Sequence, residues 1–163
     1  MRKIVLWILL AGMFIASSCL KGKSDNSNTC SYDPCNTKAP DSQVVKLAKY
    51  LSDSNITAQK HCSGLYYTII SEGTGSAPTP CSAVAVNYTG TYTSGQQFDK
   101  STAPAVFSLL SVIQGWTNGV PLIKKGGKIK LYVPPALGYG NNDYNGIPGN
   151  SILVFDIELL DFQ

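Results

Sequence analysis

Histidine and charged side chains are scarce in this sequence. One histidine, His61, and 14% charged residues are spread over 163 positions. Acid–base catalysis near neutral pH most often pairs a histidine with a second titratable group, and no such pair forms a motif around His61. No glycine-rich, phosphate-binding loop precedes a predicted helix either. The sequence therefore contains no hydrolase or transferase constellation.

An excess of charge of one sign is also missing. Beyond Lys3, eleven basic residues face ten acidic ones, so the chain past residue 18 is nearly neutral. Nucleic-acid binding depends on clustered Lys and Arg that neutralise phosphates, so we expect no nucleic-acid partner. The hydrophobic fraction of 44% is large enough to build a core, which excludes wholesale disorder.

Long apolar runs are absent after the first 16 residues. The run Ile4–Ala16 follows Arg2 and Lys3 and has 13 residues, too few to cross a bilayer core of about 30 Å as a helix. It predicts a signal peptide over 1–18. Ala16-Ser17-Ser18-Cys19 resembles a bacterial lipobox and predicts lipidation of Cys19; a plain signal peptide with a chance cysteine is the alternative. We expect a protein of the bacterial cell envelope, lipid-anchored to a membrane, with its domain facing the periplasm or the exterior.

Four further cysteines, an even number, predict two disulfides in an exported chain: Cys30, Cys35, Cys62 and Cys81. Three pairings are possible and the sequence does not choose among them; we favour Cys30 with Cys35 and Cys62 with Cys81. The alternative is a zinc site that includes His61. Because His61 and Cys62 are adjacent, both cannot easily reach one ion. We therefore expect no metal and no other cofactor.

The chain divides into four parts. After the signal peptide, residues 19–40 have almost no aliphatic side chains and predict a flexible tether. Residues 41–61 carry apolar residues at helical spacing, which predict a short amphipathic helix that braces the domain, followed by a linker. Residues 62–163 form the domain proper.

The domain has the pattern of an α+β fold. Val84–Tyr92, 128–133 and 153–159 alternate apolar and polar residues, as half-buried strands do. Val112–Val120 predicts a short, one-sided helix. One short helix against a curled antiparallel sheet is the simplest architecture that buries both apolar surfaces.

Aromatic residues recur at the ends of these elements: Tyr88, Phe98, Trp116, Tyr139 and Phe155. They could be ordinary core residues, because aromatic side chains dominate small cores. They could also line a concave apolar pocket with polar tips, the usual form of a small-ligand site. Composition alone leaves both interpretations open.

Six motifs follow one another in the domain: Val86–Gly90, Gly95–Asp99, Val112–Val120, Val133–Gly140, Ile147–Pro148 and Leu153–Leu160. In order and spacing they resemble the FK506-binding protein (FKBP) family of peptidyl-prolyl cis-trans isomerases. The resemblance implies an antiparallel half-barrel of five to six strands wrapped round one short helix. It does not extend to the signal peptide, the tether or the helix after residue 41.

The resemblance also implies a prolyl pocket with Trp116 as its floor. Asp99 would accept a hydrogen bond from the Tyr88 hydroxyl, and the Ile113 backbone N–H and the Tyr139 hydroxyl would bind substrate carbonyls. The implied catalytic residues are Tyr88, Phe98, Asp99, Trp116, Tyr139 and Phe155, and the implied substrate-binding residues are Val112, Ile113, Ile147, Ala105 and Phe107.

Two features depart from the family pattern. Ala105 stands where many members have a larger pocket residue, with Phe107 two positions on, so one wall would be thinner. The loop over 140–152, from which Ile147 would cover the pocket, has two glycines where an apolar residue and a second proline are common. Both departures bear on substrate preference and on macrolide affinity.

We expect a peptidyl-prolyl isomerase that assists the folding of exported proteins. Its partners would be proline-containing polypeptides, with FK506-type macrolides as inhibitors. One alternative is a chaperone or binding lipoprotein of the same fold without isomerase activity. Another is a structural envelope lipoprotein in which the pocket is only core.

Overall fold

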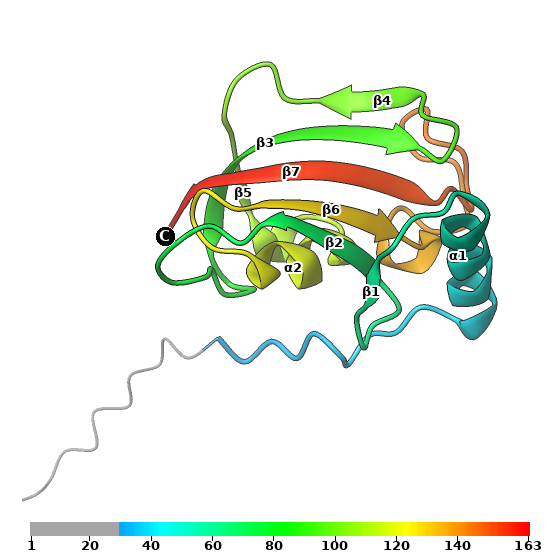
Figure 1. Cartoon of the computed structure of the whole chain (residues 1–163), viewed down its shortest axis with the longest axis horizontal. Coiled ribbons are helices and arrows are strands. Elements are labelled where there is room, and N and C mark those ends of the chain that lie inside the picture. Colours follow the sequence, from blue (N-terminus) through cyan, green and yellow to red (C-terminus); the bar gives the residue numbers. More distant parts are fainter. Residues whose placement is uncertain (1–29) are drawn as a thin grey trace, which may run out of the picture.

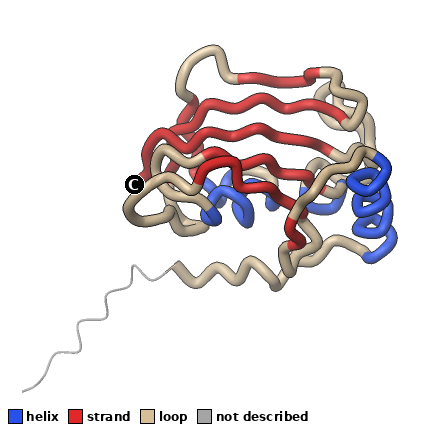
Figure 2. Tube along the Cα trace, viewed as in Figure 1, coloured by secondary structure: helices blue, strands red, loops and turns tan. Residues whose placement is uncertain are grey.

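The computed structural model describes residues 30–163; the expected signal peptide, the lipidation site Cys19 and part of the expected tether lie outside the described residues. In the described part, an antiparallel sheet curls over one short helix, as Figures 1 and 2 show. The expected α+β fold is therefore confirmed. Among residues 30–163, no helix combines the length and the apolar character needed to span a membrane.

The sheet contains seven strands: β1 (Gln59–Lys60), β2 (Tyr66–Ser71), β3 (Ala83–Tyr92), β4 (Gln97–Lys100), β5 (Ala105–Ser108), β6 (Lys128–Val133) and β7 (Leu153–Phe162). Their order is β1-β2-β6-β7-β3-β4, with β5 also paired to β3, and all pairs are antiparallel. The count exceeds the expected five to six for two reasons. β4 and β5 pair with successive parts of β3, and the two-residue β1 extends the sheet beyond β2.

Helix α2 (Gln114–Gly119) lies against the concave face, between a 3-10 turn at Leu109–Ser111 and another at Val120–Leu122. Two glycines allow this close approach. A Cβ at Gly115 would lie 2.6 Å from Val133 Cγ1, and a Cβ at Gly119 would lie 2.6 Å from Leu131 Cδ1. The backbone of α2 therefore rests directly on β6, and the main core fills the space around it.

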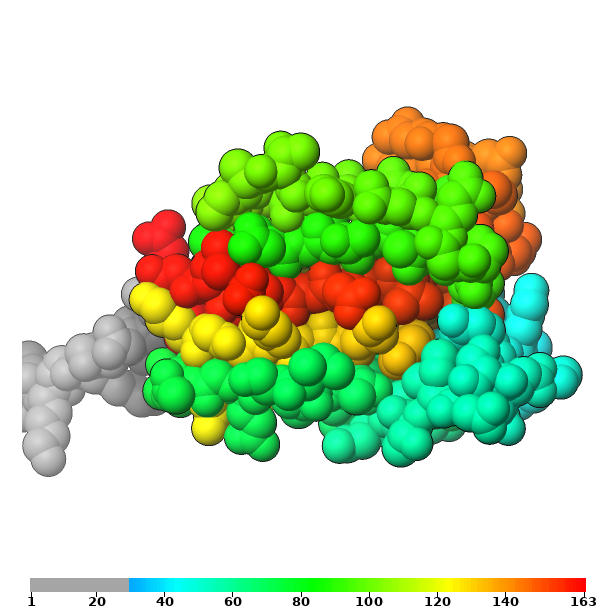
Figure 3. Space-filling model, turned by 45° about the horizontal axis from the view of Figure 1, so that its top comes forward, coloured from blue at the N-terminus to red at the C-terminus, as the bar shows by residue number. Residues whose placement is uncertain are grey.

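Helix α1 (Asp41–Asp53) covers one corner of the other face of the sheet. Its Leu47 and Leu51 pack against Tyr132 and Val154, in a cluster separate from the main core. Tyr132 and Val154 alternate along their strands with residues that face α2, so they point to the opposite side. Figure 3 shows β2, β6, β7, β3 and β4 side by side on this outer face, with α1 at one end. The helix thus packs on the outer face of the sheet.

Residues 30–40 also pack on the domain, so the prediction of a flexible tether is wrong for this stretch. The favoured disulfide pairing is wrong as well: Cys30 is bonded to Cys81, and Cys35 to Cys62. The segment runs along the domain and meets two separate turns, one before β2 and one before β3. The Cα–Cα separations of 5.7 and 5.5 Å are those of ordinary disulfides. Composition predicted a tether because it does not show these cross-links.

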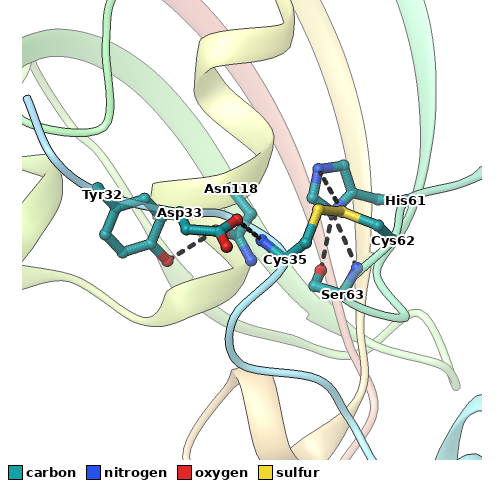
Figure 4. The surroundings of a disulfide bond; sticks show 7 residues. All are labelled: Tyr32, Asp33, Cys35, His61, Cys62, Ser63 and Asn118. Atoms are coloured by element: carbon teal, nitrogen blue, oxygen red, sulfur yellow. Dashed lines mark hydrogen bonds between the residues drawn. A yellow bond between two sulfur atoms is a disulfide. The ribbon is translucent and has the colours of Figure 1, made fainter.

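Of the residues of the zinc alternative, Cys35, His61 and Cys62 gather in space, whereas Cys30 is bonded to Cys81. The ligand atoms of Cys35, His61 and Cys62 lie within 4.8 Å of one another, as Figure 4 illustrates for the side chains. Both sulfurs, however, are joined in the disulfide. Zinc binds cysteine as the thiolate, so the bonded pair offers it no sulfur ligand.

Candidate functional site

A cavity of about 670 Å³ lies between α2 and the concave side of the sheet. Its volume is that of a small-molecule site. Aromatic and aliphatic side chains dominate the lining, which consists of Tyr88, Asp99, Phe107, Ser111, Val112, Ile113, Trp116, Gly138, Tyr139, Tyr144, Asn145 and Phe155. The structure thus brings together most of the residues that the resemblance implied.

Trp116 forms the centre of an aromatic cluster. Only 4% of its surface is exposed, and its ring meets Tyr88, Phe107 and Phe155 edge-to-face at centroid distances of 5.1, 5.7 and 5.4 Å. Edge-to-face pairs are the favoured aromatic geometry. The indole is therefore held in one orientation, with rings from β3, β5 and β7 around it.

Tyr88 and Asp99 form the polar edge of the cavity. The Tyr88 hydroxyl donates to Asp99 Oδ2 at 2.7 Å, which is the hydrogen bond that the resemblance implied. The Lys100 backbone N–H donates to Asp99 Oδ1 at 2.7 Å and fixes the carboxylate. Burial raises the pKa of Tyr88 to about 12, and the hydrogen bond from its hydroxyl to Asp99 adds to this shift. The phenol is therefore a permanent donor at neutral pH.

Ile113 and Tyr139 both line the cavity. Ile113 is the N-cap of α2, with extended backbone, and within residues 30–163 no backbone acceptor pairs with its N–H. Tyr139 is 37% exposed and its ring stacks on that of Tyr144 at 4.9 Å and 10°. Burial raises the pKa of Tyr139, with Tyr144 and Asp99 adding to the shift. An N–H and a hydroxyl are thus available to hydrogen-bond a ligand in the cavity.

Three of the implied residues lie elsewhere. Phe98 and Ile147 line an adjoining cavity of about 400 Å³, which shares Asp99, Tyr139, Tyr144 and Asn145 with the first. Phe98 still contacts Phe155, edge-to-face at 5.6 Å. Ala105 lines neither cavity. Ala105 lies on β5 and pairs with Val86 of β3, and its methyl group is shorter than the Phe107 ring that lines the cavity.

Four lining residues were not anticipated: Ser111, Gly138, Tyr144 and Asn145. Tyr144 and Ile147 exchange two backbone hydrogen bonds, of 2.9 and 2.8 Å, around the turn residues Asn145 and Gly146. Both turn residues have positive φ, 47° and 82°, as expected of Asn-Gly in a tight turn. That dipeptide was the available signal, and it would have placed Tyr144 beside Ile147.

This fold and cavity define a class of protein. Residues 75–160, more than half of the chain, match the sequence model of the family described as FKBP-type peptidyl-prolyl cis-trans isomerase. The chain belongs to this family.

Among individual relatives, the isomerase FkpA of Escherichia coli K12 is 52% identical over 104 residues, which are 62% of this chain and 38% of that protein. A probable FKBP-type isomerase of Haemophilus influenzae is 47% identical over 103 residues, 61% of this chain and 43% of that protein. The chain thus matches about two-fifths of the length of these curated relatives.

Two solved structures share the fold. The crystal structure of Escherichia coli FkpA has a TM-score of 0.68 at 43% identity, and the match covers 76% of this chain and 60% of the FkpA chain. A peptidyl-prolyl cis-trans isomerase from Pseudomonas syringae pv. tomato has a TM-score of 0.67 at 30% identity, and the match covers 78% of this chain and 98% of that one.

Proposed function

We propose that this protein catalyses the cis–trans isomerisation of X–Pro bonds in polypeptides. The observation that carries the proposal is the aromatic cavity floored by Trp116, with the Tyr88–Asp99 pair at its edge. A proline ring is apolar and compact and matches the aromatic walls, while the flanking carbonyls of a peptide need donors at the rim. Family membership supports the same activity.

The chemistry needs no nucleophile. Rotation about the X–Pro bond is slow because amide resonance resists it with a barrier of about 18–20 kcal/mol. In the twisted amide the resonance is lost and the group is less polar. A dry aromatic cavity therefore favours the twisted state over the planar one, which is differential binding of the transition state. A thousandfold acceleration needs only about 4 kcal/mol of this difference.

The residues of the cavity have separate roles in this scheme. Trp116 is the surface on which the proline ring lies. The Ile113 N–H and the Tyr139 hydroxyl hold the carbonyls on either side of the rotating bond, as preorganised donors. Tyr88 keeps Asp99 at the edge of the cavity through their 2.7 Å hydrogen bond. No proton is transferred in any step.

A protease-coupled assay on a short proline peptide tests the activity. We expect the wild-type chain to accelerate isomerisation and an FK506-type macrolide to compete with the peptide. Phe107→Leu, which shrinks a cavity wall, should lower kcat/KM. Phe162→Leu is the matched control, because Phe162 lies at the end of β7 and outside the cavity.

The assay also separates this function from a binding role. Peptide binding, seen as a rise in melting temperature, without any acceleration would replace the isomerase with a chaperone or binding module. Neither binding nor acceleration would leave the cavity as core only.

We further propose that the chain acts in the cell envelope on exported clients, anchored by a lipid on Cys19. The basic and apolar start of the sequence and the lipobox-like residues before Cys19 support this. The two disulfides fit the same setting, because disulfides persist in oxidising compartments.

A further inference from the structure

A segment outside the family-matched residues contacts the helix that carries the pocket floor. The hydroxyl of Tyr32 donates to Asn118 Oδ1 at 2.7 Å, across 86 positions of sequence, and Figure 4 shows this contact beside the Cys35–Cys62 disulfide. Asn118 lies in α2, two residues after Trp116. The match to the family begins at residue 75, so Tyr32 is an addition to the matched domain.

Tyr32 reaches α2 on the side turned away from the cavity. Residues two apart on an α-helix point about 200° apart, so Asn118 faces nearly opposite to Trp116. The glycines Gly115 and Gly119 hold a third side of the helix against β6. The short helix is thus fixed by the sheet, by the aromatic cluster and, on the remaining side, by Tyr32.

The segment that presents Tyr32 is itself rigidly attached. We call the segment of residues 30–35 the strap. The Cys30–Cys81 bond precedes Tyr32 by two residues and the Cys35–Cys62 bond follows it by three. Between them, the Cys35 N–H donates to Asp33 Oδ1 at 2.8 Å and fixes the local turn. The backbone that carries Tyr32 is therefore cross-linked to the domain on both sides.

The contact is costly to lose. Asn118 is only 3% exposed, and its Nδ2 is buried without a hydrogen-bond partner within the described residues 30–163. The Tyr32 bond thus satisfies the oxygen of an amide whose nitrogen is already unpaired. Without the hydroxyl, neither polar atom of the buried amide has a partner among the described residues, and this penalty favours a shift or turn of the helix.

We propose that Tyr32 is a positioning residue of the prolyl site. Through Asn118, the strap holds α2 in the orientation that keeps Trp116 in edge contact with its three aromatic neighbours. Substrate that lies on the indole therefore depends on a hydroxyl that never touches it. The kinetic part of this inference rests on the proposed isomerase function; the structural part, the orientation of Trp116, does not.

Tyr32→Phe tests the proposal, because it removes one hydroxyl and keeps the ring and both disulfides. The full chain would carry Trp7→Phe, so that Trp116 is the sole tryptophan. We expect altered Trp116 emission, stronger acrylamide quenching, and a kcat/KM lower by about two- to tenfold, the equivalent of one hydrogen bond. All measurements are made where urea titration shows every variant folded.

The matched control is Tyr67→Phe. It also removes a phenol hydrogen bond, from Tyr67 to Gln59 Oε1 at 3.0 Å, but Tyr67 lies on β2 and is not among the residues that line the cavity. Emission, quenching and kcat/KM should stay at wild-type values. A second background, Cys35→Ala with Cys62→Ala, frees one end of the strap; Tyr32→Phe should then add little to the effect of the double change.

The outcomes are distinct. Tyr32→Phe could lower the urea midpoint while its emission, quenching and kcat/KM stay at wild-type values. In that case the contact is only structural and the proposal is wrong. The proposal also fails if Tyr67→Phe changes emission, quenching and kcat/KM as Tyr32→Phe does. If the wild-type chain has no isomerase activity, the proposed function fails, and the emission of Trp116 still decides the role of the strap.

Discussion

Tyr88 combines an aromatic wall with a polar edge, and the two roles depend on its protonation. Its ring packs edge-to-face on Trp116 at 5.1 Å, while its hydroxyl donates to Asp99. A phenolate could not donate, so the pair requires the neutral phenol. Burial provides this, because it disfavours the charged form and raises the pKa of Tyr88 to about 12. The Tyr88 phenol thus stays protonated over the physiological range.

Isomerase activity is expected to be flat between about pH 5.5 and 8. Burial raises the pKa of both cavity phenols, Tyr88 and Tyr139, so both stay protonated throughout. Measurement of kcat/KM on one peptide across this range is the check. A bell-shaped profile, or an inflection near the ordinary histidine value of about 6.5, would reveal an acid–base step.

Protein stability over the same range is the internal comparison. His61 lies outside the cavity, and burial lowers its pKa from 6.5 in the folded state. The unfolded chain therefore binds the proton more tightly. The contribution of His61 to the unfolding free energy is lost as pH falls through about 6.5 and levels off below the folded-state pKa. Stability should vary with pH while activity does not.

At the scale of elements, the position of α2 decides the depth of the cavity. The helix has only six residues, too few to be stable alone, so tertiary contacts hold it. Gly115 lets its backbone approach Val133 on β6, and Trp116 then reaches the aromatic residues of β3 and β7. A side chain between α2 and β6 would push α2 away from the sheet and displace Trp116, the floor of the cavity.

Gly115→Ala is therefore expected to destabilise the protein although alanine favours helices. The added Cβ would lie 2.6 Å from Val133 Cγ1. Overpacking costs about 1–3 kcal/mol, which exceeds the roughly 0.5–1 kcal/mol that alanine gains in helix propensity. Urea unfolding should show a net loss of about 0.5–2 kcal/mol, and kcat/KM should fall because Trp116 moves.

The clash between Gly115→Ala and Val133 can be tested by combining this change with Val133→Ala. Val133→Ala removes the methyl groups that the new Cβ would strike, so Gly115→Ala should cost less in that variant than in the wild type. A double-mutant cycle on unfolding free energies measures the difference. Strictly additive effects would mean that the two residues are not in contact, and that α2 does not rest on β6 through Gly115.

At the scale of the whole molecule, the strap would shorten the reach of the proposed lipid anchor. The composition predicts a tether up to residue 40, but the Cys30–Cys81 bond fixes the chain to the domain from residue 30. If Cys19 carries the lipid, only residues 20–29 separate it from the first cross-link. Fully extended, that stretch reaches at most roughly 40 Å. With such an anchor, the disulfides would set an upper limit on the distance between the domain and the membrane surface.

Cys19→Ala is expected to release the protein from the membrane fraction. The thiol of Cys19 is the proposed site of acylation, and a lipid anchor is the proposed means of attachment. Fractionation of cells that express the wild type and the variant, followed by immunoblotting, measures the partition. Ser17→Ala is the control and should stay in the membrane fraction. Full membrane retention of Cys19→Ala would refute the lipid anchor.

The fold class and most of the cavity could be predicted from the amino-acid sequence. Alternation along β3, β6 and β7 has the period of a half-buried strand, and the six family motifs lie on the elements that surround the cavity. Trp116, Tyr88 and Asp99 were found in this way because each belongs to a short local pattern. Such patterns are legible in sequence, since their spacing reflects the backbone geometry of a single element or turn.

Contacts between distant residues emerge only from the folded chain. The disulfides join positions 51 and 27 residues apart, and Tyr32 meets Asn118 across 86; Tyr144 enters the lining and Ala105 stays out of it. Residues 30–40 look like a tether by composition, because they contain little apolar surface of their own. Their order comes from covalent and hydrogen-bonded contacts to other elements, and such contacts depend on how the whole chain closes rather than on any local period.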